Sequence, residues 1–182
     1  MGYYVQLTDS DVILKQQVQE EILQRWKELN KPENNHLKYG GSWVGGKQVT
    51  WHYSWMDKDY DKKVDSPQEV LEMMGFEYDI NEDGDIYITN YHSKTGSEDL
   101  FMKTIADLIE PGSTMLWHGE DGANFAWYFN GKDMQELDLK QALKLAVAEQ
   151  SKALNGVQSE PVVQEKIECD KDMLNRRFKS ML

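Results

Sequence analysis

The chain is poor in cysteine, since Cys169 is the only one among its 182 residues. A single thiol excludes an internal disulfide and any zinc site built from several cysteines, and it is typical of a reducing compartment. No run approaches the roughly 18 apolar residues of a membrane-spanning helix. The opening residues, MGYYVQ, lack the basic and apolar regions of a signal peptide. We therefore expect a cytoplasmic protein without a membrane partner.

Local motifs of catalysis are also missing. The four histidines form no HExxH pair, and no GxSxG nucleophile motif occurs. Gly41, Gly46 and Lys47 have the spacing of a phosphate-binding loop, but Gln48 replaces the hydroxyl that binds magnesium, and a strand-like run follows. Residues 79–90 resemble a calcium-binding EF-hand loop, but Asn90 replaces its bidentate glutamate. The sequence thus predicts no catalytic residue, no metal site and no cofactor.

Positive charge is scarce. The formal net charge is −12, and between Glu77 and Asp121 11 acidic residues accompany only Lys94 and Lys103. Such a field repels nucleic acid and attracts cationic surfaces. We therefore expect a protein partner with a basic surface and no direct binding of nucleic acid, although the same charge also serves solubility.

Apolar residues recur at helical spacing in three segments. One ends at Asn30, one is capped by Ser66 and stopped by Gly75, and one begins near Ser97. Two predicted hairpins follow the second and third helices, each reversing at an Asp-Gly pair that is typical of a tight β-turn. Helices alternating with hairpins indicate an antiparallel sheet covered on one face.

We therefore predict an α+β domain over residues 1–135, with a largely antiparallel sheet, helices packed on one face and a ferredoxin-like arrangement. Residues 136–182 are predicted to form a helical C-terminal extension with a linker near 155–161, because apolar residues there recur at helical spacing around Asn155-Gly156. The amphipathic helices of this extension could pack on the domain, pair between subunits or bind a partner.

The aromatic segment 40–56, GGSWVGGKQVTWHYSWM, is predicted to enter a strand over Lys47–Trp55 after a glycine-rich loop. Core packing accounts for most of the aromatic residues of the chain, and those that reach the surface near the glycine-rich loop supply binding energy at low entropic cost. Carboxylates at the two Asp-Gly turns are expected to lie in water as recognition charge. The predicted protein-binding residues are accordingly Trp43, Trp51, Trp55, Glu82, Asp83, Asp85, Glu120 and Asp121.

Four stretches carry a resemblance: MGYYVQLTDS, GGSWVGGK with SWM, YHSKTGSEDLFMKTIADLIEPGS, and HGEDGANFAWYF. Together they resemble a scattered set of small, acidic bacterial and bacteriophage proteins that carry no assigned activity. The similarity covers about residues 1–130. It implies a cytoplasmic accessory protein and transfers no functional residues.

The leading hypothesis is a non-catalytic binding protein that acts through protein contacts. A more specific version of this hypothesis is a phage-encoded inhibitor of a host defence enzyme. Inhibition by imitating the charge of nucleic acid is a variant of that hypothesis. One alternative is a small-molecule or nucleotide binder, or an enzyme, that uses the Gly/Trp loop as a pocket wall. Another is an assembly protein that forms homo-oligomers through its C-terminal helices.

Overall fold

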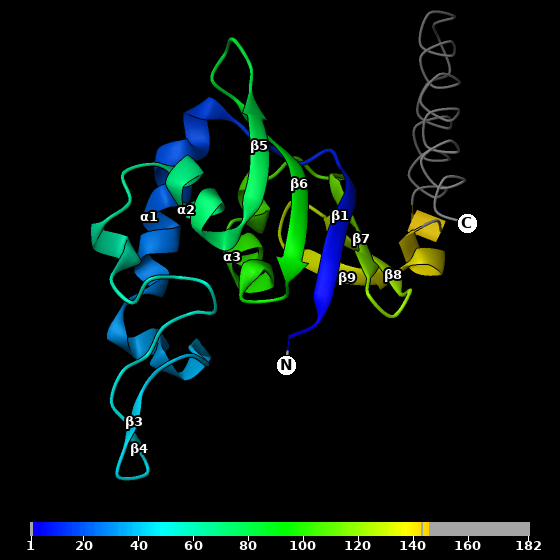
Figure 1. Cartoon of the computed structure of the whole chain (residues 1–182). Helices are drawn as coiled ribbons and strands as arrows, with labels where there is room; N and C mark the ends of the chain where they lie inside the picture. Colours follow the sequence, from blue (N-terminus) through cyan, green and yellow to red (C-terminus); the bar gives the residue numbers. More distant parts are fainter. Residues whose placement is uncertain (1, 143, 146–182) are drawn as a thin grey trace, which may run out of the picture.

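A computed structural model describes residues 2–142 and 144–145 of the chain (Figure 1). The main sheet contains seven strands, which are β1 (Tyr4–Ser10), β2 (Ile13–Leu14), β5 (Phe76–Ile80), β6 (Ile86–Lys94), β7 (Thr114–Gly119), β8 (Asn124–Phe129) and β9 (Met134–Asp138). The α-helices are α1 (Gln19–Leu29), α2 (Pro67–Met74) and α3 (Glu98–Thr104). A separate two-stranded sheet joins β3 (Trp43–Val44) to β4 (Lys47–Gln48). Short 3-10 turns occupy Gln16–Val18, Pro32–Leu37, Tyr60–Lys62 and Ala106–Leu108.

All strand pairings are antiparallel, and the predicted α+β class is confirmed. Strand β6 lies between β5 and the β1–β2 segment, because Ile86 pairs with both Ile80 and Leu14. On the other side of β1 follow β7, β8 and β9. Across the sheet, four of the strands lie in the order β7, β1, β6, β5. This is the ferredoxin-like order, with β8 and β9 added at one edge.

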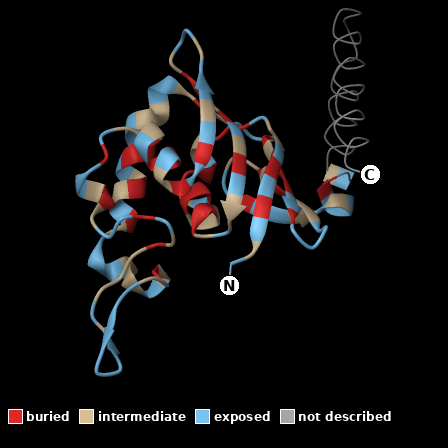
Figure 2. Cartoon of the chain, viewed as in Figure 1, coloured by how far each residue is buried: buried red, intermediate tan, exposed pale blue. Residues whose placement is uncertain are grey.

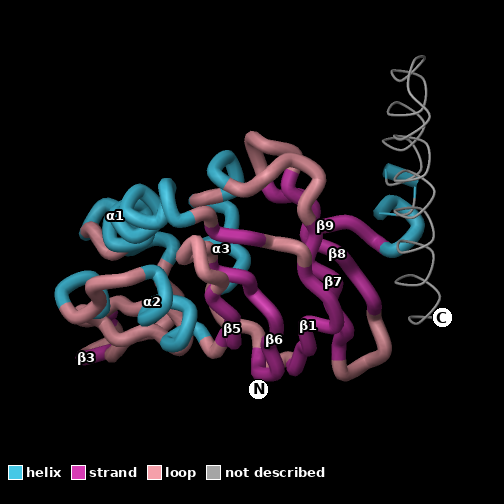
Figure 3. Tube along the Cα trace, turned by 90° about the horizontal axis from the view of Figure 1, so that it is seen from above, coloured by secondary structure: helices cyan, strands magenta, loops and turns pink. Residues whose placement is uncertain are grey.

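The three helices bury their apolar stripes against one face of the sheet (Figures 2 and 3). In α1 the side chains of Ile22 and Trp26 are fully buried, as the spacing predicts. Helix α2 begins where the Ser66 side chain accepts a hydrogen bond from the Glu69 N–H, and it ends at Gly75 in the left-handed conformation, with φ of 94°. Within the described residues, no helix is long and apolar enough to cross a membrane.

An aromatic cluster joins the helices to the segment between β4 and α2. The Trp26 indole donates to the Phe101 carbonyl at 2.8 Å, and the Tyr60 hydroxyl donates to the Trp26 carbonyl at 2.6 Å. The Tyr53 hydroxyl donates to the Leu29 carbonyl at 2.9 Å. The charged run DKDYDKKVD, residues 57–65, predicts a solvated connector. Its charged side chains are exposed or half-buried as predicted, but Tyr60 and Val64 are fully buried and the prediction is wrong for these two residues.

The opposite face of the sheet carries a small second cluster of Leu116, Ala126 and Ala142, with Leu137 packed beside it. Leu116 points away from the main core because its neighbours Met115 and Trp117 point into it. The chain enters a helix at residue 139, and Ala142 covers this patch. Strand β9 pairs with β8 and so runs across the boundary predicted at residue 135. The predicted linker near 155–161 and the second C-terminal helix lie outside the described residues.

Candidate functional site

The two acidic turns lie at opposite ends of the sheet (Figure 1). Strands β6 and β7 are both antiparallel to β1, so they run in the same direction. The turn with Glu82 and Asp83 precedes β6, whereas the turn with Glu120 and Asp121 follows β7. The structure therefore does not bring these carboxylates together in one acidic face. Both Asp-Gly segments do reverse the chain between paired strands, as predicted.

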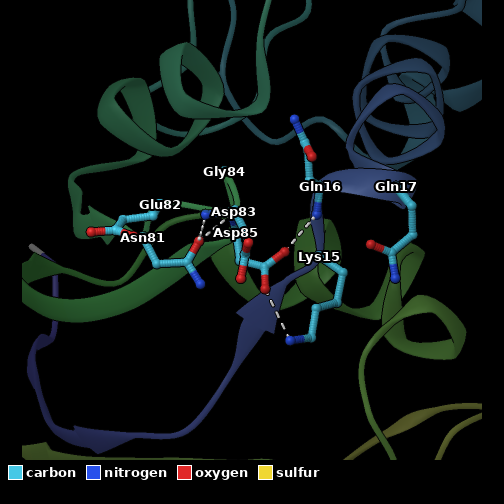
Figure 4. A pocket seen from close by; sticks show the side chains of 8 residues that line it. All are labelled: Lys15, Gln16, Gln17, Asn81, Glu82, Asp83, Gly84 and Asp85. Carbon is cyan, nitrogen blue, oxygen red and sulfur yellow. Dashed lines mark hydrogen bonds and ion pairs between the residues drawn. The ribbon is translucent and has the colours of Figure 1, made fainter.

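Asp85 has a structural role at the first turn (Figure 4). It is 7 % exposed, and its carboxylate accepts hydrogen bonds from the Gln16 N–H at 2.9 Å and from the Lys15 ammonium at 3.0 Å. These two bonds, with the backbone donor the larger cause, hold the pKa of Asp85 below its usual value. The Asn81 side chain accepts from the Asp83 and Asp85 N–H groups and shapes the turn. The expectation that Asp85 lies in water is wrong, because its carboxylate ties the turn to the 3-10 turn that precedes α1.

Asp121 holds the second turn to the N-terminal segment. Its carboxylate accepts hydrogen bonds from the Tyr3 hydroxyl and from the Ala123 N–H, the latter at 3.0 Å. The Tyr3 hydrogen bond is the main reason that the pKa of Asp121 is lowered, and it raises the pKa of Tyr3 to about 12. Glu82, Asp83 and Glu120 are exposed side chains at these turns.

The segment predicted as a long strand folds instead as a hairpin that projects from the body (Figure 1). We call residues 39–52 the hairpin arm. Gly45 and Gly46 make the tip with φ of 58° and 76°, and paired backbone hydrogen bonds between Gly40 and His52 close the root at 3.0 and 2.9 Å. The strand predicted over Lys47–Trp55 is wrong, since only Lys47–Gln48 is a strand and it pairs within the arm.

Large apolar side chains of the arm are exposed. The exposed fractions are 66 % for Trp43, 67 % for Val44 and 87 % for Tyr39, and Val49 is exposed as well. Trp51 is half-buried near the root. No helix follows Gly46 and Lys47, so the arm lacks the geometry of a phosphate-binding loop.

Buried Lys38 fixes the root of the arm. Its ammonium donates to the Asn30 carbonyl at 2.8 Å and to the Asn35 side chain at 3.0 Å, and it lies 5.6 Å from the centre of the Tyr53 ring. Burial lowers the pKa of Lys38. This cation is therefore used in packing and is not presented to a ligand by the arm.

Trp55 leaves the arm and lies against the loop between β6 and α3. Its indole donates to the Lys94 carbonyl at 3.1 Å, and a Cβ atom placed on Gly96 would lie 2.4 Å from the Trp55 ring. Trp55 has φ of 65°, a strained conformation for a bulky residue. About half of its side chain is exposed, so it also contributes apolar surface.

A cavity of about 150 Å³ lies beside that loop, on the helix-covered side of the sheet. Trp117, Phe125 and Trp127 of β7 and β8 form its aromatic wall, and its carboxylates are Glu98, Asp99 and Glu136. Sequence reasoning missed this site because its acids come from two elements and its aromatics are counted with the core. Alternation along the two strands does place the three aromatic residues on one face, which was the available signal.

Glu98 is the most buried acid of the cavity, at 5 % exposed. Its carboxylate accepts hydrogen bonds from the Tyr91 hydroxyl and from the Gly96 N–H, the latter at 2.6 Å to the nearer oxygen. Burial nevertheless dominates and raises the pKa of Glu98 above its usual value. Among the described residues, no group of three or more His, Cys, Asp or Glu side chains is placed to hold a metal ion.

Replacement of Glu98 by glutamine is expected to remove a pH-dependent loss of stability. A folded-state pKa above the unfolded value means that the contribution of Glu98 is fully present below about pH 4.5 and is lost as the pH rises through the folded pKa. Denaturant titrations at several pH values should show Glu98→Gln gaining stability relative to the wild type from pH 4 towards about pH 7. A constant difference across that range would contradict the raised pKa.

Comparison of the chain with protein-family models, with curated proteins and with solved structures gives no match.

Proposed function

We propose that the chain is a non-catalytic binding protein that contacts a protein partner through the hairpin arm. The observation that carries this proposal is the exposure of Tyr39, Trp43 and Val44 on a projection that ends in a tight glycine turn. Several large apolar side chains exposed on one projection are typical of a surface that contacts another protein. Tryptophan and tyrosine dominate the binding energy of many interfaces because they bury large areas at low entropic cost.

The net charge of −12 favours a partner with a basic surface. A partner with a basic rim around an apolar cleft would be steered toward the chain by this charge. Added salt would therefore lower the association rate and would change the dissociation rate much less. Imitation of nucleic-acid charge is less well supported, because the two acidic turns lie at opposite ends of the sheet. The phage-inhibitor form of the hypothesis remains a proposal about the identity of the partner.

The two alternatives have weaker support from geometry. A pocket wall made by the Gly/Trp segment is disfavoured by a hairpin that projects from the body with Trp43 exposed. Assembly through the C-terminal helices concerns residues outside the described part, apart from the helix start over residues 139–142, of which Ala142 packs on β7 and β8.

Photo-crosslinking followed by reconstitution tests the arm. A photoreactive residue at Val44 of the full chain should crosslink to a partner in a lysate of the source cells, whereas one at Ile80, an exposed apolar residue of β5, should not. With the identified partner purified, Trp43→Ser combined with Val44→Ser should weaken binding by about 100-fold, as expected for hot-spot residues. Ile80→Ser should stay within about twofold.

Two results would overturn this assignment. Equal affinity of the wild type and the double variant would remove the arm from the interface. Concentration-dependent self-association of the purified wild type that the double variant abolishes would identify the occupant of the arm as a second copy. Analytical ultracentrifugation of both proteins separates these outcomes.

A further inference from the structure

Apolar side chains occupy both faces of the hairpin arm. Cross-strand partners share a face of a sheet, so Trp43 lies on the same face as Gln48, and Val44 lies on the same face as Lys47. Side chains alternate along each strand, so these two pairs lie on opposite faces. Val49 continues the face of Lys47, two residues away, and its N–H is hydrogen-bonded across the arm at 2.8 Å. The three apolar side chains are exposed, one on the first face and two on the second.

This pattern restricts how a partner can cover the arm. A ribbon that lies flat on a surface needs apolar side chains on one face only, and its outer face is usually polar. Contact with a single face of this arm would leave either Trp43, or Val44 and Val49, in water. Burial of both faces requires a partner with two walls, between which the arm inserts. The backbone from Gly40 to Gly45 reaches about 17 Å when extended, which sets the greatest depth of such a cleft.

The arm also differs from the rest of the chain in charge. The chain contains 32 acidic residues, yet none lies between Asn34 and Met56. Of the two lysines in that stretch, Lys38 is buried in the root of the arm. Lys47 is exposed beside the tip, and within the described part of the chain it forms no ion pair. Its ammonium group therefore stands beside apolar side chains at the tip of the arm.

Insertion of this cation specifies the chemistry of the cleft. Removal of an ammonium group from water is costly unless the group meets an anion and further hydrogen-bond acceptors. The wall that faces Val44 and Lys47 therefore needs a carboxylate. The acidic body of the chain stays outside the cleft, where it faces the basic rim of the partner.

The backbone of the arm favours a protein over a lipid surface. Among the described residues, β3 and β4 pair only with each other, so each strand has an outer edge that no further strand covers. The N–H and C=O groups of such edges need hydrogen-bond partners, which a hydrocarbon layer lacks and a protein cleft provides. The net charge of −12 also repels anionic lipid.

We infer that the arm inserts tip first into a protein cleft that has two apolar walls and a carboxylate paired with Lys47. This inference rests on the proposed function and specifies the shape and charge of the partner. An arm seated in this way would exclude any other ligand from the same cleft, which is how a competitive inhibitor acts.

Photo-crosslinking from the two faces tests the two-walled cleft. Full chains with a photoreactive residue at Trp43 or at Val49 are irradiated in a lysate of the source cells. Both should crosslink to the same protein, and the crosslinked peptides should come from different segments of it. Crosslinking from one position alone would mean that the arm lies flat, which overturns this inference and leaves the proposed function intact. Crosslinking from neither position would contradict both.

Substitutions of Lys47 test the carboxylate. With the identified partner purified, Lys47→Gln should weaken binding about tenfold and Lys47→Glu about 100-fold, whereas Lys47→Arg, which keeps the charge, should stay within about threefold. Lys132→Gln removes the same charge from an exposed position between β8 and β9, and it should stay within about twofold. Equal effects of Lys47→Gln and Lys132→Gln would mean that the partner senses net charge alone, and would overturn the paired carboxylate.

Lipid vesicles test the rival occupant. The full chain should stay in the supernatant when vesicles of phosphatidylcholine, with or without phosphatidylserine, are sedimented. Cosedimentation that is abolished by Trp43→Ser combined with Val44→Ser would identify a bilayer as the occupant of the arm and would overturn the inference.

Discussion

Replacing Trp26 with alanine is expected to lower the free energy of unfolding by about 3–5 kcal/mol. Its side chain is fully buried, its indole donates to the Phe101 carbonyl at 2.8 Å, and its ring packs 6.2 Å from that of Phe101. Alanine would leave a cavity and an unsatisfied carbonyl between α1 and α3. Because a domain of this size is marginally stable, such a loss is a large fraction of the total.

The matched control is Trp43→Ala in the hairpin arm, which removes the same side chain from an exposed position. Substitutions at such positions usually stay within about 0.5 kcal/mol. Urea titrations of both variants followed by circular dichroism measure the difference, since both keep the same backbone elements. Similar losses for Trp26→Ala and Trp43→Ala would mean that the arm packs on the core and is not available to a partner.

Helices and hairpins were predictable because local signals and burial agree. In α1 the helical spacing of Ile22, Trp26 and Leu29 matches the stripe that is buried. At the second hairpin the Asp-Gly pair needs a residue of positive φ, which Gly122 supplies at 83°. The order of strand, helices, hairpin, helix and strand then leaves few arrangements of the sheet, and the ferredoxin-like one is realised.

The aromatic segment was not predictable from its alternation. Val49, Trp51 and Tyr53 alternate as in a half-buried strand, yet Val49 is exposed and Tyr53 is buried. The glycines decide the outcome, because Gly45 and Gly46 adopt positive φ at a tight tip and return the chain on itself. Alternation indicates an extended backbone, but it does not identify the strand that becomes its partner.

The residues of the candidate site are grouped by strand direction and by the placement of α3, which the sequence does not specify. Glu82 and Glu120 belong to similar turns, but strand direction places those turns at opposite ends of the sheet. Glu98 has the signature of a helix start, but its burial beside Trp117 follows from how α3 crosses the sheet. The net charge and the composition follow directly from the sequence, whereas the spatial grouping of the charges does not.

Replacing Gly41 with alanine is expected to open the hairpin arm while leaving the core folded. A Cβ atom at this position would lie 2.0 Å from the carbonyl oxygen of Thr50, and the backbone φ of 155° is one that only glycine adopts readily. Strain of about 1–3 kcal/mol would favour separation of the two strands. Amide hydrogen exchange should accelerate about tenfold or more at Val49 and His52, which donate to the Ser42 and Gly40 carbonyls at 2.8 and 2.9 Å.

Gly45→Asn is the opposite change within the same arm. No atom lies within 4 Å of a Cβ placed on Gly45, and asparagine tolerates its φ of 58° at the first position of a tight hairpin turn. Exchange at Val49 should slow or stay unchanged in this variant. If the paired arm is what the partner recognises, Gly41→Ala should lose affinity although Trp43 and Val44 are intact, and Gly45→Asn should keep it. Equal affinity for both would mean that the aromatic side chains act without a fixed hairpin, because only the pairing of the strands distinguishes the two variants.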